Sequence, residues 1–193
     1  MMSKGITTVL SILAIMWAVF ILDVLLPLEF TNLGLVPRRL ESLPGVVAMP
    51  FLHANFAHII GNTVPLLVLG SLVAIFYSPI ATRVFGTVIF LGGALLWLLG
   101  RPAAHVGASG LIYGLAAFLV AGGFYYRNLV SVLIALAVGA LYGFSLFVGL
   151  LPTDAAISWE GHLFGAIAGV AAAAWSRNAI RDEGRKRDAS RST

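Results

Sequence analysis

Four polar residues at the starts of long apolar segments suggest a chemical function for this chain. Ser109 lies between glycines at the start of one segment, His162 opens a second, and His58 and Asn62 open a third. A serine hydroxyl is a weak nucleophile until a base such as histidine takes its proton. A serine and a histidine brought together therefore indicate acyl transfer, the chemistry of a serine hydrolase.

Neighbouring residues suit the supporting roles that acyl transfer requires. His58 and Asn62 are one helical turn apart, so both side chains can donate hydrogen bonds to a developing oxyanion. The start of the helix that carries Ser109 adds backbone N–H groups without partners inside the helix. Tyr113 follows Ser109 by one turn and can stack on an imidazole ring. His53 precedes this set in a loop and is a weaker candidate donor.

No acidic residue has an obvious place beside the base. Glu160 comes two residues before His162 and points off its helix face, so we expect a Ser–His dyad rather than a triad. His105 is interpreted as a loop residue. The histidines do not have the spacing of a metal-binding helix motif and the chain has no cysteine, so we expect no metal and no cofactor.

Each motif taken alone also has a structural interpretation. A Gly-x-Ser-Gly sequence in a membrane helix usually serves packing, and it is not the Gly-x-Ser-x-Gly elbow of soluble hydrolases, which follows a strand. A single histidine at a helix end is more often an interfacial residue than a base. The combination of motifs is more specific than any one of them.

The composition places nearly the whole chain in a membrane. Hydrophobic residues make up 60% of the 193 residues, charged residues only 10%, and the mean hydropathy is +0.98. A soluble domain carries about 25% charged residues. The net charge of +4 comes from residues at helix ends and in the tail, so it does not indicate nucleic-acid binding.

Six segments are apolar and long enough to span a bilayer, which takes about 20 residues. Their approximate ranges are 6–27, 56–77, 84–99, 108–126, 129–150 and 159–175. The loop 28–55 is partly apolar, which suits a segment at the membrane interface. We expect the polar tail, residues 176–193, to be disordered and cytoplasmic. The prediction is an all-α, polytopic membrane protein with a single domain over residues 1–193.

Arginine and lysine positions give the predicted orientation, because these residues are enriched in cytoplasmic loops. With both termini in the cytoplasm, nine of them lie inside and three outside. The helices that begin near His58, Ser109 and His162 then all start at the outer face. We therefore expect a multi-pass protein of the bacterial inner membrane with one polar site just below its outer surface.

Glycines at four-residue spacing predict that the serine helix and the histidine helix pack closely. Small residues at this spacing let membrane helices approach one another. They are Gly110 and Gly114 on the first helix, and Gly161, Gly165 and Gly169 on the second. Ser109 and His162 each lie next to one of these glycine faces, so close packing would bring them together.

In this order, the motifs resemble the rhomboid family of intramembrane serine proteases. The matching residues are His53-x4-His58-x3-Asn62, Gly107-Ala108-Ser109-Gly110 with Tyr113, and Gly161-His162-x2-Gly165-x3-Gly169. The resemblance covers essentially the whole chain and is to the minimal six-helix bacterial form. Many rhomboids carry a Trp-Arg pair in the first loop, where this chain has Arg38-Arg39 and no tryptophan.

The resemblance implies a role for each matching residue. Ser109 is expected to be the nucleophile, and His162 the general base and acid. His58 and Asn62, with the Ser109 N–H, would form the oxyanion hole. Tyr113 would pack on the catalytic histidine.

The resemblance also implies the partners. Rhomboids cut single-span membrane proteins near the outer face of the bilayer, and such substrates would reach the site sideways from the lipid. The 129–150 helix and the 151–158 loop would act as gate and cap, and Gly107 would shape the approach to the nucleophile.

Two other interpretations belong to different functional classes. A non-catalytic rhomboid-like protein would bind membrane proteins or serve their quality control, but such relatives usually lack the serine or the histidine present here. A small transporter would be expected to have internal repeats or broken helices, and the sequence shows neither clearly.

Overall fold

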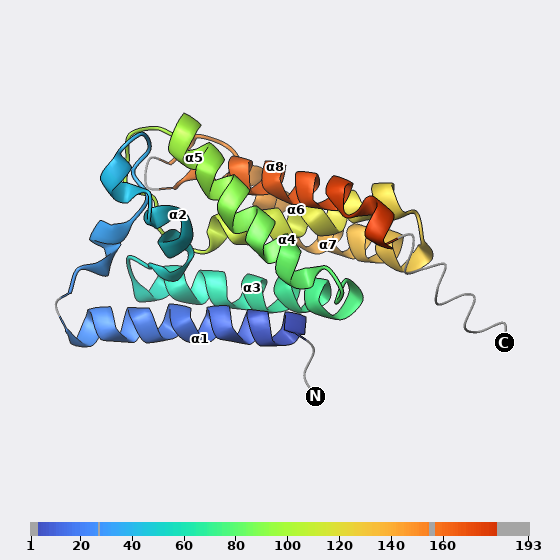
Figure 1. The fold of residues 1–193 in the computed structure, drawn as a ribbon, viewed down its shortest axis with the longest axis horizontal. Helices are drawn as coiled ribbons and strands as arrows, with labels where there is room; N and C mark the ends of the chain where they lie inside the picture. Colours follow the sequence, from blue (N-terminus) through green and yellow to red (C-terminus); the bar gives the residue numbers. More distant parts are fainter. Residues whose placement is uncertain (1–3, 27, 155–156, 181–193) are drawn as a thin grey trace.

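The computed structural model describes residues 4–26, 28–154 and 157–180, and the regular structure in these ranges is helical, without a β-strand. The long elements are α1 (Lys4–Leu25), α3 (Phe56–Phe76), α4 (Ala81–Thr87), α5 (Gly93–Leu99), α6 (Ser109–Tyr126), α7 (Leu129–Gly149) and α8 (Trp159–Trp175). A π-helical turn, Val88–Gly92, joins α4 and α5 into one segment of membrane length. Figure 1 shows these helices together in one bundle.

Five helical segments are long and apolar enough to cross a membrane, namely α1, α3, the α4–α5 segment, α6 and α7. Helix α8 has 17 residues and packs against α6 in the same bundle. The helix ends differ from the predicted ranges by no more than three residues. The predicted all-α, polytopic fold is therefore confirmed, with five segments of membrane length and α8 as a shorter sixth helix. Most of the predicted tail, residues 181–193, lies outside the described residues.

Polar N-caps fix where three of the helices begin. The side chains of Asn55, Asn128 and Ser158 each accept a backbone N–H from the first turn of α3, α7 and α8, respectively. Such caps satisfy donors that have no partner inside the helix. The starts of α3 and α8 carry His58 and His162, so the caps help to set the positions of two candidate site residues.

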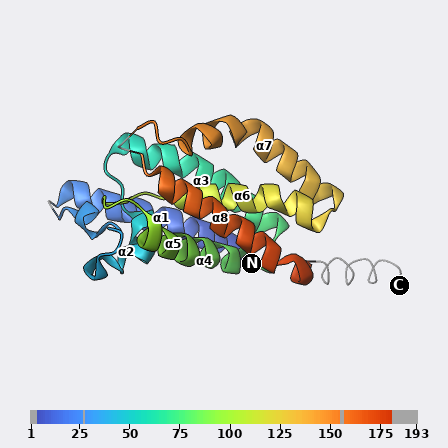
Figure 2. The same ribbon diagram turned by 90° about the horizontal axis from the view of Figure 1, so that it is seen from above.

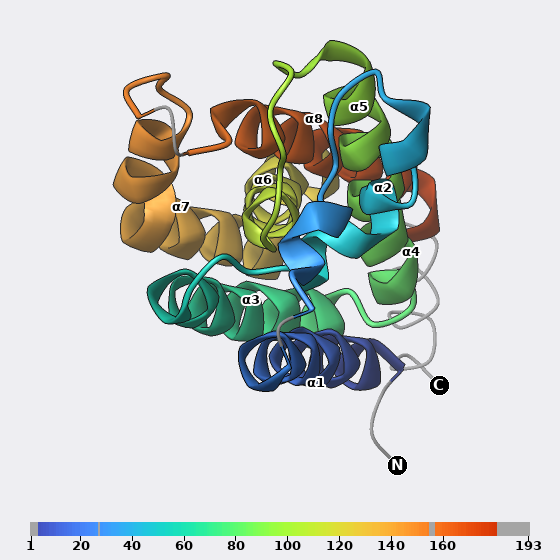
Figure 3. The ribbon, with the colours of Figure 1, turned by 90° about the vertical axis from the view of Figure 1, so that its left-hand side faces the viewer.

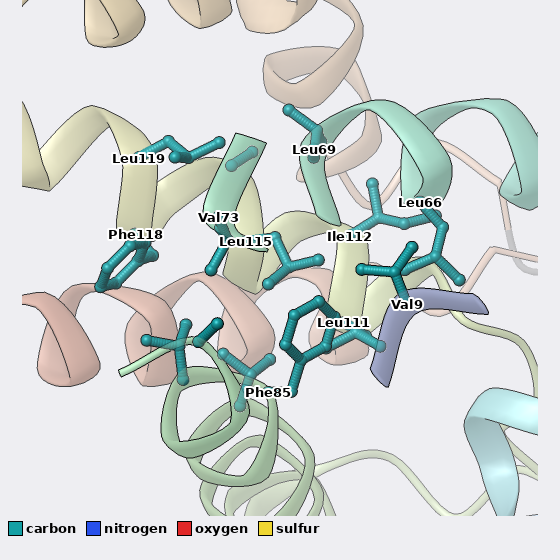
Figure 4. Close-up of a cluster of buried hydrophobic side chains, with 14 of the residues drawn as sticks. Val9, Leu66, Leu69, Val73, Phe85, Leu111, Ile112, Leu115, Phe118 and Leu119 are labelled. Atoms are coloured by element: carbon teal, nitrogen blue, oxygen red, sulfur yellow. The ribbon is translucent and has the colours of Figure 1, made fainter. Parts of the chain in front are cut away.

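Helix α6 lies at the centre of the bundle. Figure 3 shows α3, α7, α8 and the α4–α5 segment around it. Its apolar side chains pack with those of α1, α3 and α4 in one core, drawn in Figure 4. The core includes Val9, Leu66, Phe85, Leu111, Leu115 and Phe118. Because lipid tails are as apolar as these side chains, close packing rather than transfer out of water holds the helices together.

Helix α7 has buried residues only in its first half. Its buried residues are Ser131, Ile134 and Val138, whereas Leu141 and Phe144 are 77% and 82% exposed. In Figure 2, α7 lies at the outside of the bundle. The second half of α7 therefore mainly faces the lipid.

Helices α6 and α8 approach one another at their glycines, as the spacing of these residues predicts. A Cβ atom added at Gly165 would collide with the carbonyl oxygen of Gly110, and one added at Gly169 would collide with that of Gly114. A side chain larger than hydrogen therefore does not fit at either position of α8 without moving the helices apart.

The first loop docks on the end of α5, although it contains no tryptophan. It consists of short helical turns: Phe30–Leu33, Leu40–Ser42, Gly45–Ala48 (α2) and Met49–Phe51. The Arg38 guanidinium donates hydrogen bonds to the carbonyl oxygens of Gly100, at 2.8 Å, and Leu98, at 3.2 Å. Trp97 of α5 donates its indole N–H to the Arg39 carbonyl at 2.9 Å. An arginine at a helix C-terminus satisfies carbonyls that lack helical partners, so the loop supplies the arginine of this contact and α5 supplies the tryptophan.

Candidate active site

One cavity lies at the end of the bundle where α3, α6 and α8 begin. Its volume is about 540 Å³, and its wall comes from residues 54–62, 101–109 and 157–162. His58, Asn62, Ser109 and His162 all line it. The three polar helix starts therefore meet around a single space, which is in the size range of ordinary ligand pockets.

Ser109 and His162 are joined by a hydrogen bond across this cavity. The Ser109 Oγ lies 2.9 Å from His162 Nε2, and His162 Nδ1 lies 2.7 Å from the carbonyl oxygen of Gly149. A carbonyl oxygen only accepts hydrogen bonds, so Nδ1 carries the ring proton and Nε2 is free to accept the serine proton. A backbone carbonyl at the end of α7 thus orients the His162 ring, in the place where a catalytic triad would have a carboxylate.

Tyr113 stacks on the imidazole of His162. The two ring centroids are 4.0 Å apart and the ring planes differ by 3°. The tyrosine hydroxyl also donates to the carbonyl oxygen of Ser145 on α7, at 3.4 Å. The ring of His162 is therefore held on one face by Tyr113 and at Nδ1 by the end of α7.

Gly107 opens a space between Ser109 and the side chains of α3. Its φ of +108° lies in the left-handed region, which favours glycine. A Cβ atom at this position would lie 2.5 Å from His58 Nε2 and 3.7 Å from Asn62 Nδ2. Both side-chain nitrogens therefore border the space that glycine leaves open, beside the start of α6, where N–H groups lack helical partners. A carbonyl oxygen bound there would meet donors from both helices.

His53 lies behind His58 and is not among the residues that line the cavity. Its side chain is 3% exposed, and its ring centroid is 5.0 Å from that of His58. Burial, with His58 close by, lowers the pKa of His53 to about 4. His53 is therefore neutral near pH 7 and packs against His58, where the sequence suggested a further donor.

A second serine–histidine pair lines the same cavity, and sequence reasoning missed it. His105 Nδ1 lies 2.6 Å from Ser158 Oγ, and His105 Nε2 lies 3.2 Å from the Arg101 carbonyl oxygen. His105 is a loop residue, as predicted, but it is only 3% exposed. The one sequence signal for this pair is Ser158 itself, an N-cap residue directly before an apolar segment.

Glu160 does not contact the base. Its side chain is buried and its Oε1 lies 3.4 Å from Arg101 Nε, in a salt bridge between the start of α8 and the loop before α6. The partner of the Glu160 carboxylate is thus Arg101, while the ring nitrogens of His162 contact Ser109 and the Gly149 carbonyl. The described residues contain no cluster of three or more His, Cys, Asp or Glu side chains arranged to hold a metal ion.

The fold and this cavity define a class: a polytopic membrane protein with a serine, a histidine and hydrogen-bond donors around one cavity at an end of the helical bundle. The family model described as Rhomboid domain matches residues 41–178. The chain therefore belongs to the rhomboid family, whose members are generally intramembrane serine proteases.

The chain is also similar to mycobacterial proteins. It is 39% identical over 180 residues to the uncharacterized protein Rv1337 of Mycobacterium tuberculosis, covering 88% of this chain and 74% of that protein. It is 35% identical over 181 residues to the uncharacterized protein ML1171 of Mycobacterium leprae, covering 88% of this chain and 70% of that one. Each alignment spans most of both chains, so the similarity extends over the helical bundle as a whole.

Proposed function

We propose that this protein is an intramembrane serine endopeptidase that cuts single-span membrane proteins near the extracytoplasmic face. The observation that carries the proposal is the 2.9 Å bond between Ser109 Oγ and a His162 ring whose other nitrogen is held by the Gly149 carbonyl. This is the geometry that a general base needs to take a proton from a hydroxyl nucleophile.

In the first half of the reaction, Ser109 Oγ forms a bond to the carbonyl carbon of the scissile peptide while its proton passes to His162 Nε2. The carbonyl electrons move onto oxygen, and the oxyanion accepts hydrogen bonds from His58, Asn62 and the Ser109 N–H. The C–N bond then breaks, and His162 gives its proton to the leaving amine. The acyl group remains on Ser109.

In the second half, a water molecule attacks the acyl carbon and loses a proton to His162 Nε2. The ester bond breaks, the proton returns to Ser109 Oγ, and the new carboxyl end leaves. Water is scarce in the bilayer core, so this step favours a cavity at the ends of the helices. The cavity lies at the starts of α3, α6 and α8, a position that supports access of water to the site.

Ser109 is a better nucleophile candidate than Ser158, although both contact a histidine. Ser158 Oγ also accepts the Gly161 N–H at 3.2 Å, which ties it to the start of α8. Ser109 lies next to the space that His58 and Asn62 border. An acyl transfer needs donors beside the nucleophile, so the first pair has what the second lacks.

The exposed second half of α7 supports lateral access from the lipid. This half has no buried residue among those described, yet its last residue, Gly149, contacts the base. A substrate that enters beside α7 must present an unwound peptide bond, because a helix keeps its amides in hydrogen bonds. We expect substrates with glycine or other weak helix formers near the outer end of the span.

Reconstitution with membrane-spanning reporters tests this function. Purified protein is placed in liposomes with a panel of single-span proteins whose helices carry glycines near one end, and products are mapped by mass spectrometry. We expect wild type to cut reporters near the extracytoplasmic end, and Ser109→Ala and His162→Ala to cut none. Cleavage that persists in Ser109→Ala would contradict the proposal. Stable complexes with uncut reporters would contradict it too and would favour the non-catalytic alternative.

A further inference from the structure

We infer that His105 and Ser158 are positioning residues that hold the nucleophile and the base in register. The inference rests on the proposed function, because it concerns the same Ser109–His162 pair. The two residues and the 2.6 Å bond between them are called the clasp below. Each clasp residue precedes one member of the reacting pair by four residues, His105 before Ser109 and Ser158 before His162.

The hydrogen bonds of the clasp have one consistent direction. The Arg101 carbonyl only accepts, so His105 Nε2 donates to it, at 3.2 Å, and Nδ1 accepts the Ser158 hydroxyl proton. The Ser158 oxygen is then free to accept the Gly161 N–H, at 3.2 Å. Burial lowers the pKa of His105, which keeps the ring in the neutral form that this arrangement uses.

The clasp joins two segments that are distant in the sequence. His105 is fixed on its own side by two backbone bonds to Leu35, of 2.8 Å and 3.0 Å. Ser158 fixes the first turn of α8, because its carbonyl accepts the His162 N–H at 3.1 Å while its hydroxyl caps the helix. The loop that carries His105 is thereby tied both to Leu35 and to the backbone turn that carries His162.

Arg101 makes a second link between the same segments. Its guanidinium donates to the Ile157 carbonyl at 2.6 Å and forms the salt bridge with Glu160. The link runs beside the clasp, so the α5–α6 loop and the start of α8 are joined at two points. The glycine contacts bring α6 and α8 together, and the clasp adds a link between the α5–α6 loop and the start of α8 beside the cavity.

A simple N-cap would need only the serine oxygen. Here the cap hydroxyl has a buried histidine as its acceptor, and both residues line the cavity that holds Ser109 and His162. The pair thus acts on the reaction through the position of the base, without touching the reacting atoms. An error of about 1 Å in the position of a catalytic group can cost about a hundredfold in rate.

The test compares labelling rates with a fluorophosphonate probe in detergent, on full-length protein. We expect His105→Ala and Ser158→Ala to lower the maximal inactivation rate constant at least about tenfold, with little change in the probe concentration for half-maximal rate. The double variant should lose no more than either single variant, since both remove the same link. Ser158→Thr keeps the hydroxyl and His105→Asn keeps an acceptor in place of Nδ1, so both should retain most of the rate.

Asn128→Ala is the matched control. The substitution removes the N-cap bond of α7, which is 2.9 Å long, and Asn128 is not among the residues that line the cavity. Asn and Ser are comparably favourable N-cap residues, so the loss of either cap destabilises the protein. We expect Asn128→Ala to lower the thermal unfolding temperature, as Ser158→Ala does, but to be labelled at the wild-type rate.

Three results separate the clasp from the proposed function. Labelling that depends on Ser109 but is unchanged in folded His105→Ala and Ser158→Ala would overturn the clasp alone. Folded wild type that the probe does not label would overturn the proposed function. Labelling that survives Ser109→Ala and is abolished by Ser158→Ala would overturn both, because His105 and Ser158 would then be the reacting pair.

Discussion

Replacing Gly165 with alanine is expected to separate the nucleophile from the base without changing either residue. The added Cβ atom would collide with the Gly110 carbonyl oxygen and lie 2.8 Å from the Gly110 carbonyl carbon, whereas ordinary contacts begin at 3.4 Å. Backbone atoms cannot swing aside as a side chain does. Helix α8 therefore has to move away from α6 by at least about 0.6 Å, the shortfall in that second contact.

This movement acts on a short bond. For movement along the line between the two residues, the Ser109–His162 distance of 2.9 Å would grow to at least about 3.5 Å, beyond the normal hydrogen-bond range. A base at that distance takes the serine proton poorly, and we expect the labelling rate to fall by about ten- to a hundredfold. Overpacking of this kind also costs about 1–3 kcal/mol of stability.

The assay is the rate of fluorophosphonate labelling, with thermal unfolding in detergent measured on the same samples. Gly86→Ala in α4 is the matched control, since nothing lies within 4 Å of a Cβ atom there. The labelling rate of Gly110→Ala should lie between those of Gly165→Ala and Gly86→Ala. Its Cβ would meet the Gly161 carbonyl oxygen at 3.0 Å, so the helices need to move less. Folded Gly165→Ala protein that is labelled at the wild-type rate would refute the reasoning that the α6–α8 contact sets the reacting distance.

Three further predictions concern the surroundings of the pair. Asn62→Ala should lower the rate of reporter cleavage by about a hundredfold or more, because it removes an oxyanion donor. Tyr113→Phe keeps the stack on His162 and should be labelled near the wild-type rate. The labelling rate of Tyr113→Ala should fall by about two- to tenfold, which corresponds to the free energy of one aromatic contact. The pKa of His53 is 6.5 when unfolded and about 4 when folded. As pH falls from 6.5 to 4, the unfolded chain alone therefore takes up this proton, and stability should drop by up to about 3 kcal/mol. The fall in unfolding temperature between pH 7 and pH 4.5 should be smaller for His53→Phe than for wild type. An equal fall in both proteins would contradict a lowered pKa for His53.

The fold was predictable because its signals are local. A run of about 20 apolar residues has few structures open to it in a bilayer, so length and composition located the helices. The four-residue glycine spacing likewise predicts which faces meet, and in the structure Gly165 of α8 lies against Gly110 of α6. Ser109 and His162 are next to these faces, and for that reason their proximity follows from the pattern.

The parts that sequence reasoning missed depend on backbone groups or on contacts between distant segments. The Gly149 carbonyl orients the His162 ring, but every residue has a carbonyl, so nothing in the sequence indicates this contact. The partners His105 and Ser158 are 53 residues apart, and they meet only because a loop docks against the start of α8. In the same way, Trp97 contacts Arg39 across 58 residues and gives the first loop an anchor that its own sequence lacks.

The central claim is that His162 activates Ser109, and the site of a fluorophosphonate adduct tests it most directly. Purified wild type, Ser109→Ala and His162→Ala are treated with the probe in detergent, and the modified residue is mapped by mass spectrometry. We predict an adduct on Ser109 in wild type and none in either variant. An adduct on Ser158, or none in folded wild-type protein, would contradict the account.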